Sequence, residues 1–338
     1  MMHVTNTLVM PISGSKFPNQ IAITKHLVGC GYMPDLIMGS SGGCIAGMLM
    51  ITADIGSVKC SSTYQKYCSR LDDMLKELDK SWYMSPWSNN PILNTAIGLG
   101  NGSLYNKGNG ESFMTKYKVD LDKQPEMWMG TRSFTEACSQ VFCTRSKDDS
   151  LIALKGAKYM NSSISYAIKA SMASCSVPGI VPMVDIHNNK YIDGGVSHAS
   201  PLGPCMCAFD DNQISFHIVY ICSIRYSSKE DPLTSEIEDD DIWNRFASST
   251  AGMVTGLHIP DRNNGIRAVG PDAKKKHGIG RAGLIKALAR QKRSHRSFIE
   301  LCPLQAEQTN FVTMKKGDAK ISVDASYESG FSVRHWYV

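Results

Sequence analysis

Hydrophobic and polar positions in the first 50 residues follow the order strand, helix, strand, helix. An apolar run at 7–12 predicts a strand, and apolar positions at 21, 22, 27 and 28 recur at approximately helical spacing after Pro18. A second apolar run, 36–38, predicts another strand, and the small and apolar residues at 44–50 predict a helix directly behind it. This order favours a parallel sheet with crossover helices.

The hydrophobic pattern is less regular between residues 54 and 122. A helix of mixed charge is expected from Tyr64 to Trp82, and prolines and glycines interrupt the rest of the segment. Two interpretations fit this pattern equally well, namely a cap that covers a functional site and a plain surface insertion.

Regular elements return after residue 122. A weak strand is expected at Arg132 to Thr135 and a stronger one at Gln140 to Thr144. Asn161 to Cys175 is typical of a helix, with Asn161 or Ser162 as its N-cap. The run from Ile214 to Ile224 predicts a buried strand.

The C-terminal third has its own pattern. An acidic run at Glu236 to Asp241 is suited to the first turn of a helix, where it complements the helix dipole. The segment from Lys274 to Arg296 is basic and carries an apolar stripe, so it predicts a further helix. Short strands are expected at Phe298 to Cys302 and at Phe311 to Met314.

The first candidate for chemistry is the sequence Gly39-Ser40-Ser41-Gly42-Gly43, which reads G-x-S-x-G. It stands between a predicted strand and a predicted helix, where such a turn exposes the serine hydroxyl and the flanking glycines allow the chain to double back. The helix N-terminus adds unpaired N–H groups that stabilise negative charge. Because many Gly/Ser-rich pentapeptides are plain turns, that interpretation stays open.

The second candidate is Asp193, which follows the apolar residues Tyr191-Ile192 and precedes Gly194-Gly195. A proline-containing run from Ala173 to Pro182 leads to it. An isolated Asp-Gly-Gly is more often a β-turn than a catalytic site. The meaning of Asp193 therefore depends on what it pairs with.

Composition narrows the class of protein only slightly. The chain has 338 residues, 42% of them hydrophobic, and a formal net charge of +5, which argues neither for nor against nucleic acid as a partner. Its 11 cysteines lack CxxC or zinc-type spacing, which favours reduced thiols in a cytoplasmic protein and no metal site. We recognise no signal peptide and no apolar stretch long enough to span a bilayer.

Three motifs in this order resemble the patatin-like phospholipase family. They are the Gly39–Gly43 elbow, the run from Ala173-Ser174 through Val177-Pro178-Gly179 to Pro182, and Asp193-Gly194-Gly195 followed by Ser200-Pro201-Leu202. Each motif alone is weak, but three in order with suitable strand and helix contexts are specific. The resemblance covers roughly residues 5 to 225.

The resemblance implies an α/β fold, namely a three-layer α/β/α arrangement with a mostly parallel central sheet. We expect a catalytic core at 5–225, with 54–122 as a candidate cap insertion, and a C-terminal extension of helices and strands at 226–338. The implied activity is hydrolysis of acyl esters in phospholipids or glycerolipids without a cofactor. The implied site comprises a catalytic dyad (Ser41, Asp193), an oxyanion hole (Gly14, Ser15, Gly42), elbow glycines (Gly39, Gly43) and the glycines after the aspartate (Gly194, Gly195).

One family feature is eroded in this sequence. The glycine-rich loop before the first helix reads Ile12-Ser13-Gly14-Ser15-Lys16-Phe17, and only Gly14 and Lys16 match the family pattern. Backbone N–H groups can donate without glycine, but they need suitable backbone angles. A catalytically weak or inactive lipid-binding homologue is therefore one alternative.

A Ser-His-Asp esterase is the other enzymatic alternative, since His187 and His198 flank Asp193. The basic segment from Lys274 to Arg296 admits three roles: a solvated helix face, which we favour, peripheral contact with an anionic membrane, or contact with nucleic acid. The last has no aromatic residues between the basic ones and no recognised motif behind it, so no nucleic acid is expected.

Overall fold

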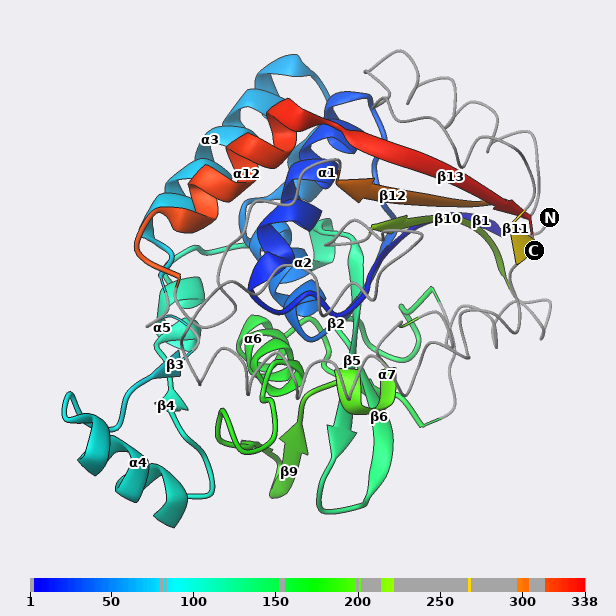
Figure 1. Ribbon diagram of the computed structural model, residues 1–338. Coiled ribbons are helices and arrows are strands. Elements are labelled where there is room, and N and C mark those ends of the chain that lie inside the picture. Colours follow the sequence, from blue (N-terminus) through cyan, green and yellow to red (C-terminus); the bar gives the residue numbers. More distant parts are fainter. Residues whose placement is uncertain are drawn as a thin grey trace.

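A mostly parallel central sheet flanked by helices organises the protein, as the computed structural model shows (Figure 1). The structure describes residues 3–79, 82, 84–151, 156–198, 201, 214–221, 267–268, 297–303 and 314–337. Five neighbouring strands at the centre of the sheet are all parallel. In spatial order they are β12 (Ser297–Pro303), β10 (Ile214–Ile221), β1 (His3–Met10), β2 (Leu36–Ser40) and β5 (Glu126–Ser133). The predicted fold class is confirmed.

Antiparallel strands extend this parallel centre on both sides. Beyond β12 lie β13 (Phe331–Tyr337) and β11 (Arg267–Ala268). On the other side, β5 pairs with β6 (Cys138–Cys143) and β9 (Asn189–Ile192); β6 pairs in parallel with β7 (Lys158–Tyr159), and β9 pairs with β8 (Val184–Ile186). Because β9 lies along β5, the residue after Ile192 is delivered beside the central strands.

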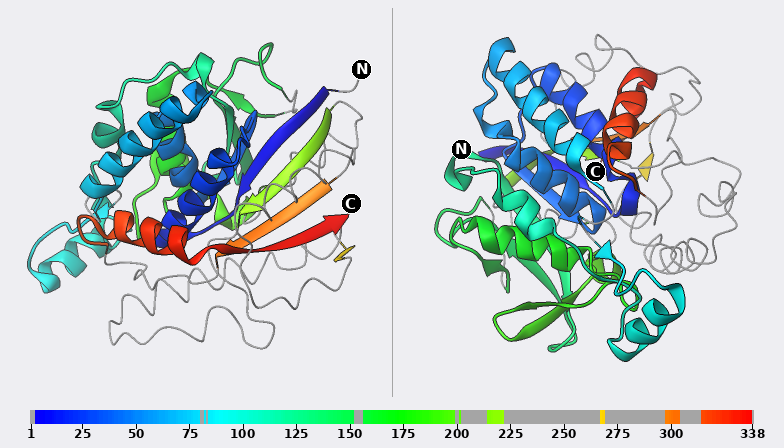
Figure 2. Two further views of the ribbon diagram at one scale, coloured as in Figure 1. Left: turned by 90° about the horizontal axis from the view of Figure 1, so that it is seen from above. Right: turned by 90° about the vertical axis from the view of Figure 1, so that its left-hand side faces the viewer.

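The helices pack according to the polarity of their sequences. Helix α2 (Gly42–Thr52) contains no charged residue and is buried on every side, in contact with β1 and β2. Helices α1 (Phe17–Gly29), α3 (Ser61–Glu77) and α12 (Asp318–Ser329) contact one another in a group (Figure 2). Helix α6 (Ile164–Ser174) packs on α2 and β5. Shorter elements are the helices η1 (Gly14–Lys16), η2 (Ile55–Ser57), η4 (Leu121–Lys123), α4 (Pro91–Gly100), α5 (Gly110–Thr115) and α7 (Gly195–His198), and the strands β3 (Met84–Ser85) and β4 (Asn106–Lys107).

Several predicted elements exist with shifted ends. The helix expected from Tyr64 to Trp82 ends at Glu77, and Leu78 has extended backbone. Neither Asn161 nor Ser162 is an N-cap, since both have positive φ in the turn before α6 and Ser163 occupies the cap position. Of the weak strand expected at Arg132 to Thr135, only Arg132 and Ser133 are strand, at the end of the longer β5, and the other two residues lie in the turn that follows.

The C-terminal elements were predicted least well. Met314 is not part of a strand, and 311–313 lie outside the described residues. Helix α12 was not predicted, because its exposed Ile321 and buried Val323 do not form a helical apolar stripe. The predicted helices beginning at Glu236 and spanning Lys274–Arg296 lie outside the described residues. Strands β12 and β13 continue the same sheet as β1, and the division of the chain at 225/226 stays a prediction.

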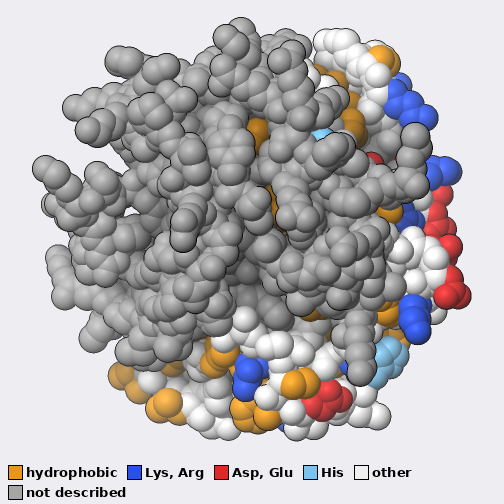
Figure 3. Space-filling model, turned by 90° about the vertical axis from the view of Figure 1, so that its right-hand side faces the viewer, with side chains coloured by type: hydrophobic (Ala, Val, Ile, Leu, Met, Phe, Trp, Pro, Cys, Tyr) orange, Lys and Arg blue, Asp and Glu red, His pale blue; other side chains and the backbone are white. Residues whose placement is uncertain are grey.

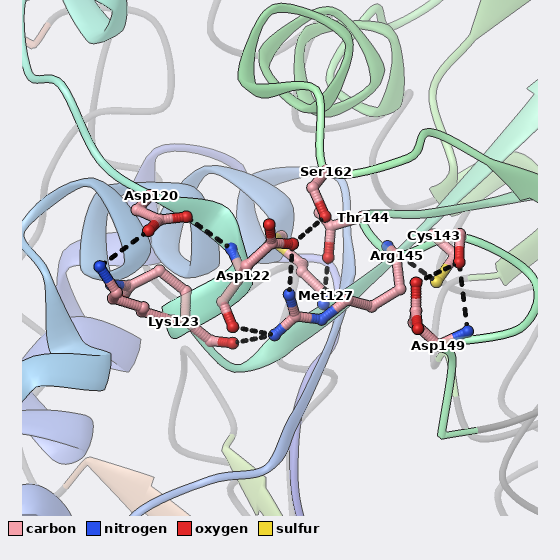
Figure 4. Close-up of polar contacts among 11 residues, drawn as sticks. Asp120, Asp122, Lys123, Met127, Cys143, Thr144, Arg145, Asp149 and Ser162 are labelled. Carbon is pink, nitrogen blue, oxygen red and sulfur yellow. Dashed lines mark hydrogen bonds and ion pairs between the residues drawn. The ribbon is translucent and has the colours of Figure 1, made fainter.

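A polar cluster anchored by Arg145 joins the segment before β5 to the start of α6 (Figure 4). The Arg145 guanidinium donates to the Asp122 side chain and carbonyl and to the Gln124 carbonyl. The Asp122 carboxylate also accepts a hydrogen bond from the Ser162 hydroxyl. These charge-assisted bonds fix where α6 begins relative to β5 and β6.

We predict that Gly43→Ala destabilises the protein, whereas Gly100→Ala does not. A Cβ on Gly43 would lie 2.2 Å from the Met10 carbonyl oxygen of β1, so α2 and β1 would have to separate. We expect the free energy of unfolding to fall by about 2 kcal/mol or more, as for other overpacked sites. A Cβ on Gly100, at the end of α4, meets nothing within 4 Å and serves as the control. Urea unfolding measures both values, and equal stability of the two variants would contradict the packing argument.

Candidate active site

Ser41 occupies a strained turn between β2 and α2. Its backbone angles are φ 51° and ψ −128°, a region that costs a residue other than glycine about 1–3 kcal/mol. The flanking glycines are needed because the chain approaches other backbone closely: a Cβ on Gly39 would lie 2.9 Å from the Cys44 nitrogen, and Gly43 lies against the Met10 carbonyl. The predicted strand–turn–helix elbow is therefore present.

Asp193 lies directly against Ser41, although 152 residues separate them in the sequence. The Ser41 hydroxyl donates to Asp193 Oδ2 at 2.7 Å, and the Gly195 amide donates to Oδ1 at 2.6 Å. A Cβ on Gly194 would lie 2.0 Å from the Gly130 carbonyl oxygen of β5. The absence of a side chain at 194 thus lets the Asp193 turn seat against the central sheet.

The environment of Asp193 changes its acidity. Burial raises the pKa of its carboxyl to about 7, and the hydrogen bonds from Ser41 and Gly195 oppose this increase by favouring the charged form. A carboxylate with a pKa in this range is a far better proton acceptor at neutral pH than an exposed aspartate. The pair therefore has the contact and the acidity that proton transfer from a serine requires.

The residues expected to form an oxyanion hole lie next to this pair. Gly14 has φ 51°, and Ser15 is buried in η1. A Cβ on Gly42, the first residue of α2, would lie 2.4 Å from the Gly14 carbonyl oxygen, so the loop before α1 touches the N-terminus of α2. Gly14, Ser15 and Gly42 are thus brought together beside Ser41.

Ser13, where the family has glycine, also lies at this junction. Its hydroxyl oxygen is buried without a hydrogen-bond partner and stands 2.4 Å from the position of a Cβ on Gly42. From the sequence Ser13 counted only as a lost glycine, and the structure adds a hydroxyl group beside the candidate oxyanion donors.

Ser174 was not predicted as a site residue, although it lies in the run that starts at Ala173. Its hydroxyl accepts from the Ser41 amide at 2.8 Å and donates to the Gly130 carbonyl at 2.6 Å. Its carbonyl accepts from the Gly194 amide at 3.0 Å. One residue at the end of α6 is therefore hydrogen-bonded to the Ser41 turn, to strand β5 and to the Asp193 turn, and it fixes their relative positions. Only the position of Ser174 before Val177-Pro178 hinted at this role.

The two histidines considered as bases differ in what the structure describes. His187 is exposed on the turn between β8 and β9, and its ring stacks on Tyr166 with the centroids 4.7 Å apart. The side chain of His198 lies outside the described part of the structure, so a triad through His198 stays a hypothesis.

A model of the patatin-like phospholipase family matches residues 14–206, which include Gly14, Ser41 and Asp193. The chain belongs to the patatin-like phospholipase family. Members of this family are lipid acyl hydrolases. A search of curated proteins gave no match. Among the solved structures that match is VipD from Legionella pneumophila, at 10% identity and a TM-score of 0.32, with 97% of this chain and 68% of VipD covered.

The part of the chain that the structure describes contains no helix both long and apolar enough to cross a bilayer.

We predict that Ser174→Ala destabilises the protein far more than Ser171→Ala. Both serines are buried in α6, but the Ser171 hydroxyl has no hydrogen-bond partner. Removing the Ser174 hydroxyl takes one hydrogen-bond partner from the Ser41 amide and one from the Gly130 carbonyl, and a buried group left unsatisfied costs about 1–3 kcal/mol. Thermal and urea unfolding of the two variants test this difference. A loss no larger for Ser174→Ala than for Ser171→Ala would show that Ser174 does not hold the site together.

Proposed function

We propose that this patatin-like protein cleaves carboxylic ester bonds of phospholipids or glycerolipids through a Ser41–Asp193 dyad. The observation that carries the proposal is the direct hydrogen bond of 2.7 Å between Ser41 Oγ and Asp193 Oδ2, in a chain of a family of lipid acyl hydrolases. A serine hydroxyl needs a group that removes its proton, and Asp193 is in contact with that proton.

Acylation begins when Ser41 Oγ attacks the carbonyl carbon of the ester and its proton passes to Asp193 Oδ2. The negative charge on the carbonyl oxygen is met by the N–H of Gly42 and by the N–H groups of Gly14 and Ser15. The tetrahedral intermediate then collapses: the bond to the alcohol breaks, and Asp193 returns the proton to the departing alkoxide. The products of this half-reaction are a free alcohol and an acyl ester on Ser41.

Deacylation repeats these steps with water. Asp193 takes a proton from the water molecule while its oxygen attacks the acyl carbon, and the second intermediate expels Ser41 Oγ, which recovers the proton. The net reaction consumes one ester and one water and releases one acid and one alcohol. It needs no metal or redox group.

The eroded loop supports a slower enzyme as the second candidate. Ser13 and Phe17 replace glycines of the family pattern. A weakly active or inactive lipid-binding protein would keep the Ser41–Asp193 contact but release little fatty acid.

We further propose a cytoplasmic location with peripheral contact at membranes. Because Lys274–Arg296 lies outside the described residues, the structure offers no support for that segment as the contact.

We predict that a fluorophosphonate probe labels the wild type but not Ser41→Ala, and labels Asp193→Asn much more slowly. The probe reacts with an activated serine hydroxyl, so Ser41 must supply the oxygen and Asp193 the base. Ser171→Ala is the control, since it removes a buried hydroxyl that has no partner. Labelling that survives in Ser41→Ala would refute the assignment of the nucleophile.

His198→Ala belongs to the same experiment because it separates the dyad from a triad. The dyad predicts that this variant keeps its labelling and its hydrolysis of a short-chain ester. Complete loss of both in a folded His198→Ala protein would favour the Ser-His-Asp esterase. A labelled wild type that hydrolyses no lipid would favour the weakly active alternative.

We predict that kcat/KM for a soluble ester rises with pH through about 7, because Asp193 must lose its proton before it can accept the one from Ser41. Stability changes in the opposite direction. The pKa of Asp193 is raised in the folded state, so between about pH 4 and 7 the folded protein binds more protons than the unfolded chain. The free energy of unfolding therefore falls as the pH rises through this range.

The Asp193→Asn variant provides the control for both effects. It lacks the titrating carboxyl, so its free energy of unfolding should increase relative to that of the wild type as the pH rises from 4 to 7. A wild-type rate profile that is flat through this range, or a stability difference that does not change with pH, would contradict the raised pKa.

A further inference from the structure

An arm formed by residues 84–107 projects from the body of the protein. Its strands β3 and β4 pair with each other in a two-stranded sheet separate from the central one, and they hold helix α4 (Pro91–Gly100) at the far end. Figure 1 and the right-hand view of Figure 2 show α4 standing apart from the other helices. The arm falls within the segment predicted as either a cap or a surface insertion.

Helix α4 exposes its apolar side chains and turns a polar one inward. Ile92, Leu93 and Leu99 are 83%, 51% and 73% exposed. Ile92 and Leu99, seven residues apart, lie on the same side of the helix, and Leu93 adjoins them about 100° further around its axis. Asn94, on the opposite side, is partly buried: its side chain accepts from the amides of Trp87 and Ser88 and donates to the Leu104 carbonyl. Three large apolar side chains therefore point to solvent, whereas the usual amphipathic helix directs its apolar stripe to the core; Ile97, on the same side as Asn94, is half-buried.

The polar groups near the exposed face are satisfied within the arm. The Asn90 side chain caps α4 by accepting from the amides of Ile92 and Leu93. The Trp87 indole donates to the Ser103 carbonyl. A surface built in this way can enter an apolar medium without carrying these backbone donors there unpaired, which would be costly.

Apart from Lys107 in β4, at its base, the arm is also free of charge. No Asp, Glu, Lys or Arg occurs from Ser81 to Asn106 in the sequence. In contrast, Figure 3 shows Lys or Arg side chains beside Asp or Glu side chains along the described surface on another side of the molecule. A face that is apolar and uncharged matches hydrocarbon and offers nothing to pair with a charged protein surface.

The base of the arm is fastened to the loop that leads to Asp193. The amides of Leu104 and Tyr105 donate to the carbonyls of Gly179 and Ile180, both at 3.0 Å. Met84 packs against Ile180 and Val181. The carbonyl of Ser176, at the start of the same loop, accepts from the Asp193 amide at 2.9 Å. The arm and the candidate active site therefore share one support.

We propose that the apolar face of α4, formed by Ile92, Leu93 and Leu99, inserts into the surface of a lipid bilayer or aggregate and seats the protein there. Insertion follows the physics of interfacial helices, in which buried apolar area supplies the binding free energy. Because α4 and the segments that flank it, from Ser81 to Asn106, carry no charge, binding needs no anionic lipid. The choice of a lipid surface as the partner rests on the proposed function.

The test compares two variants with the same kind of chemical change, an exposed apolar side chain replaced by serine. The arm variant carries Ile92→Ser, Leu93→Ser and Leu99→Ser. The control carries Phe134→Ser and Ile321→Ser, which remove apolar side chains 60% and 59% exposed elsewhere on the surface. Both are made in full-length protein with Ser41→Ala, so that the vesicles stay intact. Co-sedimentation with vesicles of pure phosphatidylcholine measures the partition coefficient.

We expect the arm variant to bind these vesicles at least about tenfold more weakly than the parent, because it loses the three apolar side chains that enter the lipid. We expect the control to bind as well as the parent. Equal binding by the arm variant and the parent would overturn the proposal, as would binding that requires anionic lipid. Sedimentation velocity without lipid adds a further test: if the parent is a dimer that the arm substitutions dissociate, a second copy covers this face and the proposal is wrong.

The outcome is distinguishable from failure of the proposed function, because binding is measured without turnover. In the catalytically intact background, the arm substitutions should lower hydrolysis of phosphatidylcholine vesicles and leave hydrolysis of a soluble short-chain ester unchanged. If the ester rate falls equally, the arm supports the Asp193 loop instead of binding lipid, and the proposal fails. If no variant hydrolyses any ester yet the vesicle difference persists, only the enzymatic assignment fails.

Discussion

The Ser41–Asp193 hydrogen bond depends on backbone segments that approach more closely than any Cβ would allow. Gly43 lies against the Met10 carbonyl of β1, and Gly194 lies against the Gly130 carbonyl of β5. The contact at Gly43 fixes how closely the Ser41 turn lies to the sheet, and the contact at Gly194 does the same for the Asp193 turn. Since both turns rest on the same rigid sheet, two side chains far apart in sequence meet at 2.7 Å. Ser174 connects the two turns, because it accepts hydrogen bonds from the Ser41 amide and from the Gly194 amide.

The close packing that brings Ser41 and Asp193 into contact also reduces the stability of the fold. Backbone strain at Ser41 and the desolvation of the Asp193 carboxyl both lower the free energy of unfolding, and neither residue contributes an apolar side chain to the core. The surrounding structure compensates: α2 is buried along its whole length, and the loop before β5 is held by Arg145. Activity and stability therefore make opposite demands on Asp193, which is expected where a charged group must be kept ready in a dry site.

The sequence predicted the parts of this protein that depend on local pattern. The elbow at Gly39–Gly43 and the strand before Asp193 were recognisable because glycine positions and apolar runs report backbone geometry directly. The N-cap of α6 was misplaced, because the positive φ of Asn161 and Ser162 comes from a turn that packs against β6. Ser174 could not be assigned, since its partners Ser41 and Gly130 are 133 and 44 residues away. The outward apolar face of α4 was hidden for the same reason: only folding reveals which side of a helix is left without a partner.

The long separation between Ser41 and Asp193 has a consequence for how activity arises during synthesis. Strand β1 pairs with β2 early, but its other edge is covered by β10, whose residues are made some 200 positions later. A nascent chain thus carries its serine long before its aspartate, and domains of this size complete their sheets only when late strands arrive. Until β9 pairs with β5, the Ser41 hydroxyl lacks the Asp193 carboxylate as its hydrogen-bond partner. The Ser41–Asp193 contact therefore cannot form in any chain that ends before β9.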